Sequence, residues 1–152
     1  MTYRKIIAVA AATIALGGAA SVVAAPKDTI AARQANFKLI GKSFKGINDE
    51  VRKPAGDINA VRGHANALAQ AASKVGGHFP RGTGPEAGVK TSALPAIWQK
   101  QADFKGWTAK LVDASNKMNA AARSGNMAQV KAAIPGVGST CKGCHDSFKA
   151  KD

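Results

Sequence analysis

Two cysteines and a histidine form the segment of this chain best suited to chemistry, Cys141-Lys142-Gly143-Cys144-His145. The 152 residues include only two cysteines, and both fall here, three positions apart, with a histidine directly after the second. C-x-x-C-H is the attachment motif of c-type haem: the thiols form thioethers with the porphyrin vinyl groups and the imidazole binds the iron. The motif therefore predicts one covalent haem c, held by Cys141 and Cys144, with His145 as the metal ligand.

Other uses of a C-x-x-C pair have weaker support in the sequence. A thioredoxin-like dithiol needs a βαβ unit, and no strand pattern is visible. A zinc site needs four ligands, and His64 and His78 lie far from the motif and are expected at the surface. A non-haem alternative stays open, namely a basic helical binding protein with a Cys141–Cys144 disulfide. Acid–acetone extraction separates the two, because thioether-bound haem stays with the chain.

The motif must be positioned by helices. On a helix, residues 141, 144, 145 and 148 share one side, so we expect all four to face the interior of a helical bundle. The composition agrees with this, because hydrophobic residues make up 45% of the chain while aromatic residues make up only 5%. We therefore predict an all-α protein.

Four segments carry apolar residues at helical spacing, over about residues 28–52, 57–75, 95–123 and 127–149. A Gly- and Pro-rich loop, 76–94, joins the second to the third. Pro95 suits the first position of the third helix, and Pro135 with its neighbouring glycines is expected to kink or split the fourth. The pattern predicts one domain, an antiparallel four-helix bundle that encloses the haem near its C-terminal helix.

Residues 1–25 have the pattern of a signal peptide. Arg4 and Lys5 precede a short apolar run, and small residues lead to a cleavage site near Ala24 or Ala25. The apolar run is too short to span a bilayer comfortably, which argues against a membrane anchor. We therefore expect residues 26–152 to be the haem-binding domain, exported to the periplasm.

The charge of the chain is strongly positive, with 22 Lys and Arg against 9 Asp and Glu and a net charge of +13. Removal of the signal peptide lowers this to about +11. The lysines are scattered and form no aromatic-interleaved basic cluster, so no nucleic-acid partner is expected. The charge instead favours a redox partner with an acidic face. No catalytic triad, paired carboxylate site or phosphate loop is present, so we do not expect an enzyme.

The chain resembles cytochrome c′, the class II c-type cytochromes, over about residues 26–152. That family is an exported four-helix bundle with C-x-x-C-H close to the C-terminus. The matching features are Arg33 in the first helix, Pro95-Ala96-Ile97-Trp98 at the start of the third, and the run from Cys141 to Lys149. The resemblance implies electron transfer, binding of small gases such as nitric oxide and carbon monoxide, and a homodimer through the first two helices.

The resemblance also implies roles for individual residues. His145 is the sole protein ligand to the iron, and the opposite face lies open under an apolar side chain four residues after Arg33, which is Phe37. Phe37 is equally suited to ordinary core packing. Low-spin relatives use a first-helix Met as sixth ligand, and residues 26–52 contain no Met. A low-spin, six-coordinate electron carrier, with a Lys or His as sixth ligand, remains the alternative.

Three further residues are candidate haem contacts. Arg33 lies on the apolar stripe of the first helix, where it either pairs with a haem propionate or extends to the surface at the bundle end. Phe148 shares the helix side of the two cysteines. Lys149 follows His145 by four residues, where the family often has Arg; Lys keeps the charge but loses the bidentate geometry, and a solvated Lys is the alternative.

Overall fold

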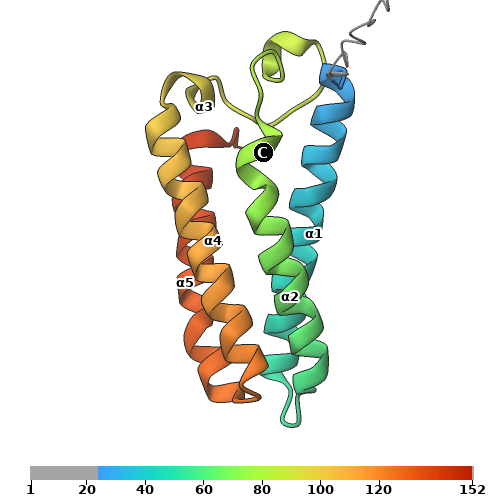
Figure 1. Ribbon diagram of the computed structural model, residues 1–152, viewed down its shortest axis with the longest axis vertical. Helices are drawn as coiled ribbons and strands as arrows, with labels where there is room; N and C mark the ends of the chain where they lie inside the picture. Colours follow the sequence, from blue (N-terminus) through green and yellow to red (C-terminus); the bar gives the residue numbers. More distant parts are fainter. Residues whose placement is uncertain (1–23, 152) are drawn as a thin grey trace, which may run out of the picture.

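The computed structural model describes residues 24–151 as an antiparallel bundle of four long helices (Figure 1). The predicted all-α, four-helix architecture is confirmed. The signal peptide prediction rests on residues that lie almost wholly outside the described part of the chain. The long helices are α1 (Pro26–Arg52), α2 (Ile58–Lys74), α4 (Gln101–Arg123) and α5 (Met127–Phe148), and between α2 and α4 lie the short elements η1 (Val75–His78), η2 (Pro85–Ala87) and α3 (Ala96–Gln99).

Local signals in the sequence explain several helix ends. The Asp57 carboxylate accepts a hydrogen bond from the backbone N–H of Asn59 at 2.8 Å and so caps α2, as the sequence predicted. The Asn126 side chain caps α5 in the same way. Gly125 has φ of 78°, a left-handed conformation that glycine adopts without steric cost, and it lets α4 turn back into α5.

The third helix differs from the sequence prediction, and the fourth is not split. The third is split at Lys100, where φ is −115° and ψ is 54°, into the short α3 and the long α4. The Trp98 indole N–H donates to the carbonyls of Phe79 and Pro80, both at 3.1 Å. These bonds attach α3 to the preceding loop, so that α3 does not continue along the axis of α4. The fourth helix is continuous through Pro135 rather than split. An interior proline lacks the N–H donor and its ring crowds the carbonyl four residues earlier, so packing of the neighbouring turns into the core holds the helix together.

The core has two parts. A main cluster runs along the bundle and includes Ile47, Leu68 and Met118. A smaller end cluster of Ile97, Phe104 and Phe148 lies where the C-terminal end of α5, α3 and the loop meet, at the top of Figure 1. Helix α1 packs mainly on α2, α4 on α5, and α2 on α4, whereas α1 and α5 touch least among the four neighbouring pairs.

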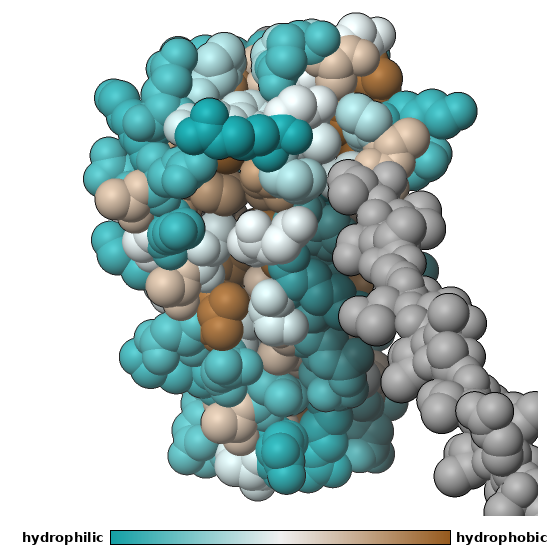
Figure 2. Space-filling view, turned by 45° about the horizontal axis from the view of Figure 1, so that its top comes forward, coloured by the Kyte–Doolittle hydropathy of each residue, from teal (hydrophilic) through white to brown (hydrophobic). Residues whose placement is uncertain are grey.

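The surface is predominantly hydrophilic, as the face in Figure 2 shows. Lysines form ion pairs with carboxylates three or four residues away along α1, α4 and α5, and exposed pairs of this kind contribute little to stability. Among the described residues, Leu39 on α1 is the one large apolar side chain that is exposed. No helix in residues 24–151 is both long enough and apolar enough to cross a membrane.

Candidate functional site

The C-x-x-C-H segment lies on the last turns of α5. Cys141 and Cys144 are half-buried and Phe148 is buried, but His145 is exposed. The prediction that all four residues face the bundle interior is therefore wrong for His145. With about 100° of rotation per residue, 141, 144 and 148 fall within a narrow arc, and 145 falls at its far edge. The imidazole thus lies at the boundary between the apolar stripe and the solvent.

The two thiols are free cysteines in apolar surroundings. Cys141 packs against the main cluster and Cys144 against the end cluster. Burial raises the pKa of both thiols, and that of Cys144 rises to about 11, with Cys141 adding to the effect. Reactive C-x-x-C pairs depend on a lowered thiol pKa, so this pair is unlike them. Within residues 24–151, no three His, Cys, Asp or Glu side chains come together as a metal site.

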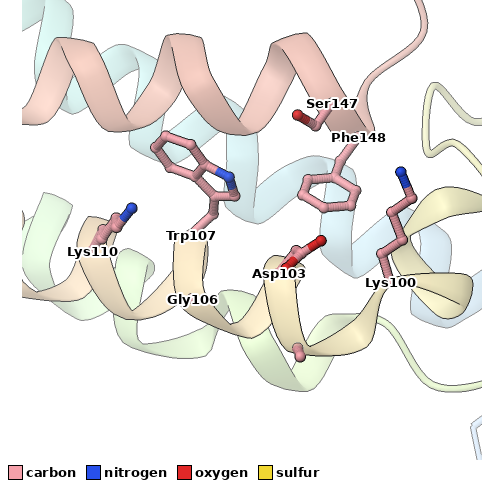
Figure 3. A pocket seen from close by; sticks show the side chains of 8 residues that line it. Lys100, Asp103, Gly106, Trp107, Lys110, Ser147 and Phe148 are labelled. Carbon is pink, nitrogen blue, oxygen red and sulfur yellow. The ribbon is translucent and has the colours of Figure 1, made fainter.

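Trp107 covers one side of the motif. Its indole extends from α4 towards α5 (Figure 3), and a Cβ added at Gly143 would clash with the indole Cη2 atom. Only glycine in the middle of the motif allows this contact. Lys110 places its ammonium 4.3 Å from the indole centroid. The indole lines a groove between α4 and α5, together with Asp103 and Phe148. Trp107 lies outside the motif and was not predicted to belong to the site.

Arg33 is only 3% exposed, so its guanidinium does not extend to the surface. Nη2 donates to the Thr83 carbonyl at 2.9 Å and to the Thr91 hydroxyl at 2.8 Å. Nη1 donates to the Thr83 hydroxyl at 3.3 Å and to the His78 carbonyl at 3.5 Å. Burial lowers the Arg33 pKa, but a guanidinium stays charged in proteins. A propionate would have to share this cation with the loop, and pairing with a propionate stays a prediction.

Aromatic rings form a connected chain at this end of the bundle. Phe79 meets Phe37 edge-on at 6.2 Å between centroids and Phe104 at 4.8 Å. Phe104 in turn meets Phe148 at 5.3 Å. Phe37 is half-buried and packs against the same main cluster as Cys141. Phe79 could not be assigned to the site from the sequence, because a single aromatic in a Gly- and Pro-rich loop belongs to no periodic pattern.

The other predicted residues are placed as follows. Lys149 is half-buried and donates to the Ala150 carbonyl at 3.4 Å, and its haem contact stays a prediction.

His64 and His78 are half-buried rather than fully at the surface. The His64 ring packs against Gly46 of α1, where a Cβ would clash with its Nε2. The pKa of His78 is lowered, first by burial and then by the positive charges of Arg33 and Lys74.

These residues fit a c-type haem. Two unpaired thiols and one imidazole lie on consecutive turns of one helix, beside an aromatic cluster and a buried cation. Helix α1 carries Arg33 and Phe37, and α5 carries the motif. These two helices make few contacts with each other. A haem is an apolar macrocycle with two carboxylates, so it needs apolar walls for the ring, positive charge for the carboxylates and ligands for the iron.

Comparison with known proteins shows the family to which this chain belongs. The family model described as cytochrome C′ matches residues 28–149. The chain belongs to the cytochrome c′ family. A cytochrome c′ from Rubrivivax gelatinosus is 37% identical over 126 residues, covering 83% of this chain and 97% of that protein.

Solved cytochrome c′ structures share the fold of this family member. One is the nitric oxide complex of a mutant from Alcaligenes xylosoxidans, with a TM-score of 0.75 and 28% identity over 86% of this chain and 99% of that one. Another cytochrome c′, described as having an unusual ligand-controlled dimer dissociation, has a TM-score of 0.78 and 29% identity over 86% of this chain and 100% of that one. As a cytochrome c′ family member, this chain has covalent haem c as its cofactor, and its two cysteines are those of the attachment motif.

Proposed function

We propose that this chain is a periplasmic monohaem cytochrome c′ that binds small gases, nitric oxide and carbon monoxide among them, at an open iron face and exchanges electrons with an acidic protein partner. In this proposal His145 is the sole protein ligand and Phe37 covers the opposite face. The observation that carries it is the position of Phe37, an aromatic without a lone pair, in the same apolar cluster as Cys141.

The side chains of α1 support an open face. The buried residues of this helix are apolar apart from Ser43 and Arg33, whose guanidinium is held by the loop. Lys38 and Lys42, which could donate an amine to iron, are exposed. A neutral hydroxyl and a charged guanidinium are poor iron ligands, so α1 supplies no strong sixth ligand.

Different residues of the chain would hold different parts of the haem. Bound haem supplies the redox couple and the gas-binding metal. Cys141 and Cys144 would anchor it by thioethers, and His145 would supply a nitrogen ligand to the iron. Arg33 and Lys149 provide positive charge for the propionates, and Phe148 provides an apolar wall. The nitric oxide complex of the A. xylosoxidans mutant supports gas binding here by similarity.

The visible spectrum of the purified holoprotein, with and without carbon monoxide, tests this function. We expect high-spin, five-coordinate iron in both oxidation states, and a ferrous spectrum that changes on addition of carbon monoxide. A low-spin ferrous spectrum with sharp α and β bands that ignores carbon monoxide would contradict the open face. That outcome would favour the six-coordinate electron carrier.

We also propose that the chain forms a homodimer. The exposed Leu39 on α1 offers an apolar contact on the helix pair that the family resemblance implicates in dimers. The ligand-controlled dimer dissociation described for a structural neighbour supports a homodimer that responds to gas. Sedimentation of the ferrous protein with and without carbon monoxide tests this. A monomer under both conditions would contradict it.

A further inference from the structure

The loop between α2 and α3 is attached to α1 by one buried cation. Arg33 donates to Thr83 and Thr91, both in this loop, and Thr83 is itself only 3% exposed. The Thr83 hydroxyl also donates to the Pro80 carbonyl at 2.8 Å, so the loop is fixed to itself at the same point. A second tie, from the Gln34 amide to the Lys90 carbonyl at 2.9 Å, is exposed to solvent. The buried tie is therefore the stronger constraint on the loop.

The same cation fixes the ring of Phe79. The Arg33 guanidinium carbon lies 4.7 Å from the centroid of that ring, within the range of a cation–π contact. Phe104 meets the ring edge-on and Trp98 lies 6.2 Å away at a tilt. Phe79 is thus braced by a charge and two aromatic rings.

Phe37 has this braced ring as its neighbour. The two rings meet edge-on at 68°, and both pack against the main cluster. A gas that reaches iron under Phe37 must displace the Phe37 ring, and Phe79 resists displacement towards the loop. Close packing transmits such resistance, because a filled interior has no free volume for a ring to enter.

We propose that Phe79 is a specificity-determining residue for gas binding and that Arg33 is its positioning residue. Arg33 holds the loop and the Phe79 ring in place, and Phe79 limits how readily Phe37 moves aside. This inference rests on the proposed function, since it requires a gas that binds under Phe37. It gives Arg33 a role that is independent of a propionate.

Variants of the two threonines separate the roles of Arg33. Thr83→Val and Thr91→Val, combined, remove two acceptor hydroxyls but leave the guanidinium in place. Gln34→Ala is the matched control, because it also cuts a tie between α1 and the loop but does not contact Phe79. We expect the double variant to speed amide hydrogen exchange in residues 79–91 by about tenfold. Carbon monoxide association, measured by flash photolysis, should rise by roughly the same factor, with an unchanged reduction potential.

The Phe79 ring is tested by a conservative change. Phe79→Leu keeps an apolar side chain but removes the ring, and it should also speed carbon monoxide association. Combined with the threonine changes, it should add little, because both act through the same ring. Circular dichroism confirms that each variant keeps its helices.

Several outcomes would overturn the inference. Faster amide exchange with unchanged carbon monoxide association would show that the loop does not act on the gas site. Unchanged exchange would show that the bonds from Arg33 to the two threonine hydroxyls do not restrain the loop, contrary to the proposal. Additive effects of Phe79→Leu and the threonine changes would separate the ring from the cation. If the wild type binds no carbon monoxide, the proposed function fails, whereas failure of this inference alone leaves wild-type binding intact.

Discussion

In the proposed function, Phe37 is the side chain through which packing controls gas affinity. It is half-buried, meets Phe79 edge-on and has no atom that can bind iron. Phe37→Ala removes the ring that a gas would have to displace under this proposal. We expect carbon monoxide affinity to rise by about tenfold, equivalent to about 1.4 kcal/mol, with faster association. Stopped-flow mixing with carbon monoxide measures both.

Phe44→Ala is the control for this variant. Phe44 lies two turns further along α1, is half-buried and packs against the same main cluster. It should lose comparable stability without a change in carbon monoxide affinity. Equal gains in the two variants would point to general loosening of the bundle. Phe37→Met adds a further test, since its thioether would make the iron low-spin.

The two cysteines are expected to act independently in attachment. Either Cys141→Ala or Cys144→Ala should leave one thioether and impair maturation, and the double variant should carry no covalent haem. Mass spectrometry of protein purified from the periplasm measures the added haem mass. Wild-type protein without that mass, after correct export, would contradict covalent attachment.

Ser115 is a polar residue whose replacement should stabilise the protein. Its hydroxyl is fully buried in α4 and has no hydrogen-bond partner. Ser115→Ala removes the unsatisfied group and raises helix propensity, so we expect a gain of about 1 kcal/mol in the free energy of unfolding. Thr140→Val is the contrast, because the Thr140 hydroxyl donates to the Val137 carbonyl and its loss should destabilise. Thermal unfolding measures both changes.

At the scale of elements, the short η1 segment makes the stability of the loop depend on pH. His78 ends this segment, and its pKa is lowered from 6.5 because the ring is half-buried and faces Arg33 of α1 and Lys74 of α2. The unfolded chain therefore binds a proton more readily than the folded one. The stability contributed by neutral His78 is fully present above pH 6.5 and declines as the pH falls below it.

This pH dependence has a direct test. Amide exchange in residues 75–91 should speed up between about pH 7 and pH 5 in the wild type, after correction for intrinsic exchange. The increase should be smaller in His78→Gln. His64→Gln is the matched control, because His64 is the other half-buried histidine and lies on α2 against α1, outside this loop. Equal pH profiles in the wild type and His78→Gln would remove His78 as the cause.

At the scale of the whole molecule, the net positive charge, about +11 once the signal peptide is removed, should govern encounters with charged redox agents. Oxidation of the ferrous protein by hexacyanoferrate(III), an anion, should slow by about tenfold as salt shortens the screening length from about 30 Å to about 8 Å. A cationic cobalt(III) complex should show the opposite trend. The same direction for both reagents would show that charge does not steer encounter, and would weaken the case for an acidic partner.

The sequence by itself determined the features that depend on near neighbours in the chain. The C-x-x-C-H spacing is covalent information, and helical stripes and caps follow from contacts three or four residues apart. The four long helices, the Asp57 cap and the loop between the second and third helices could therefore be predicted. The family resemblance rested on the same local motifs.

Only the tertiary structure decided what lies against what over long distances. Arg33 meets a loop that is 45 to 58 residues away in sequence, and Phe79 in that loop becomes the centre of the aromatic cluster. The break at Lys100, the continuity at Pro135 and the exposure of His145 likewise depend on neighbouring elements. Loop contacts have no period, and whether a helix bends or continues depends on how much packing surrounds it, which no local pattern records.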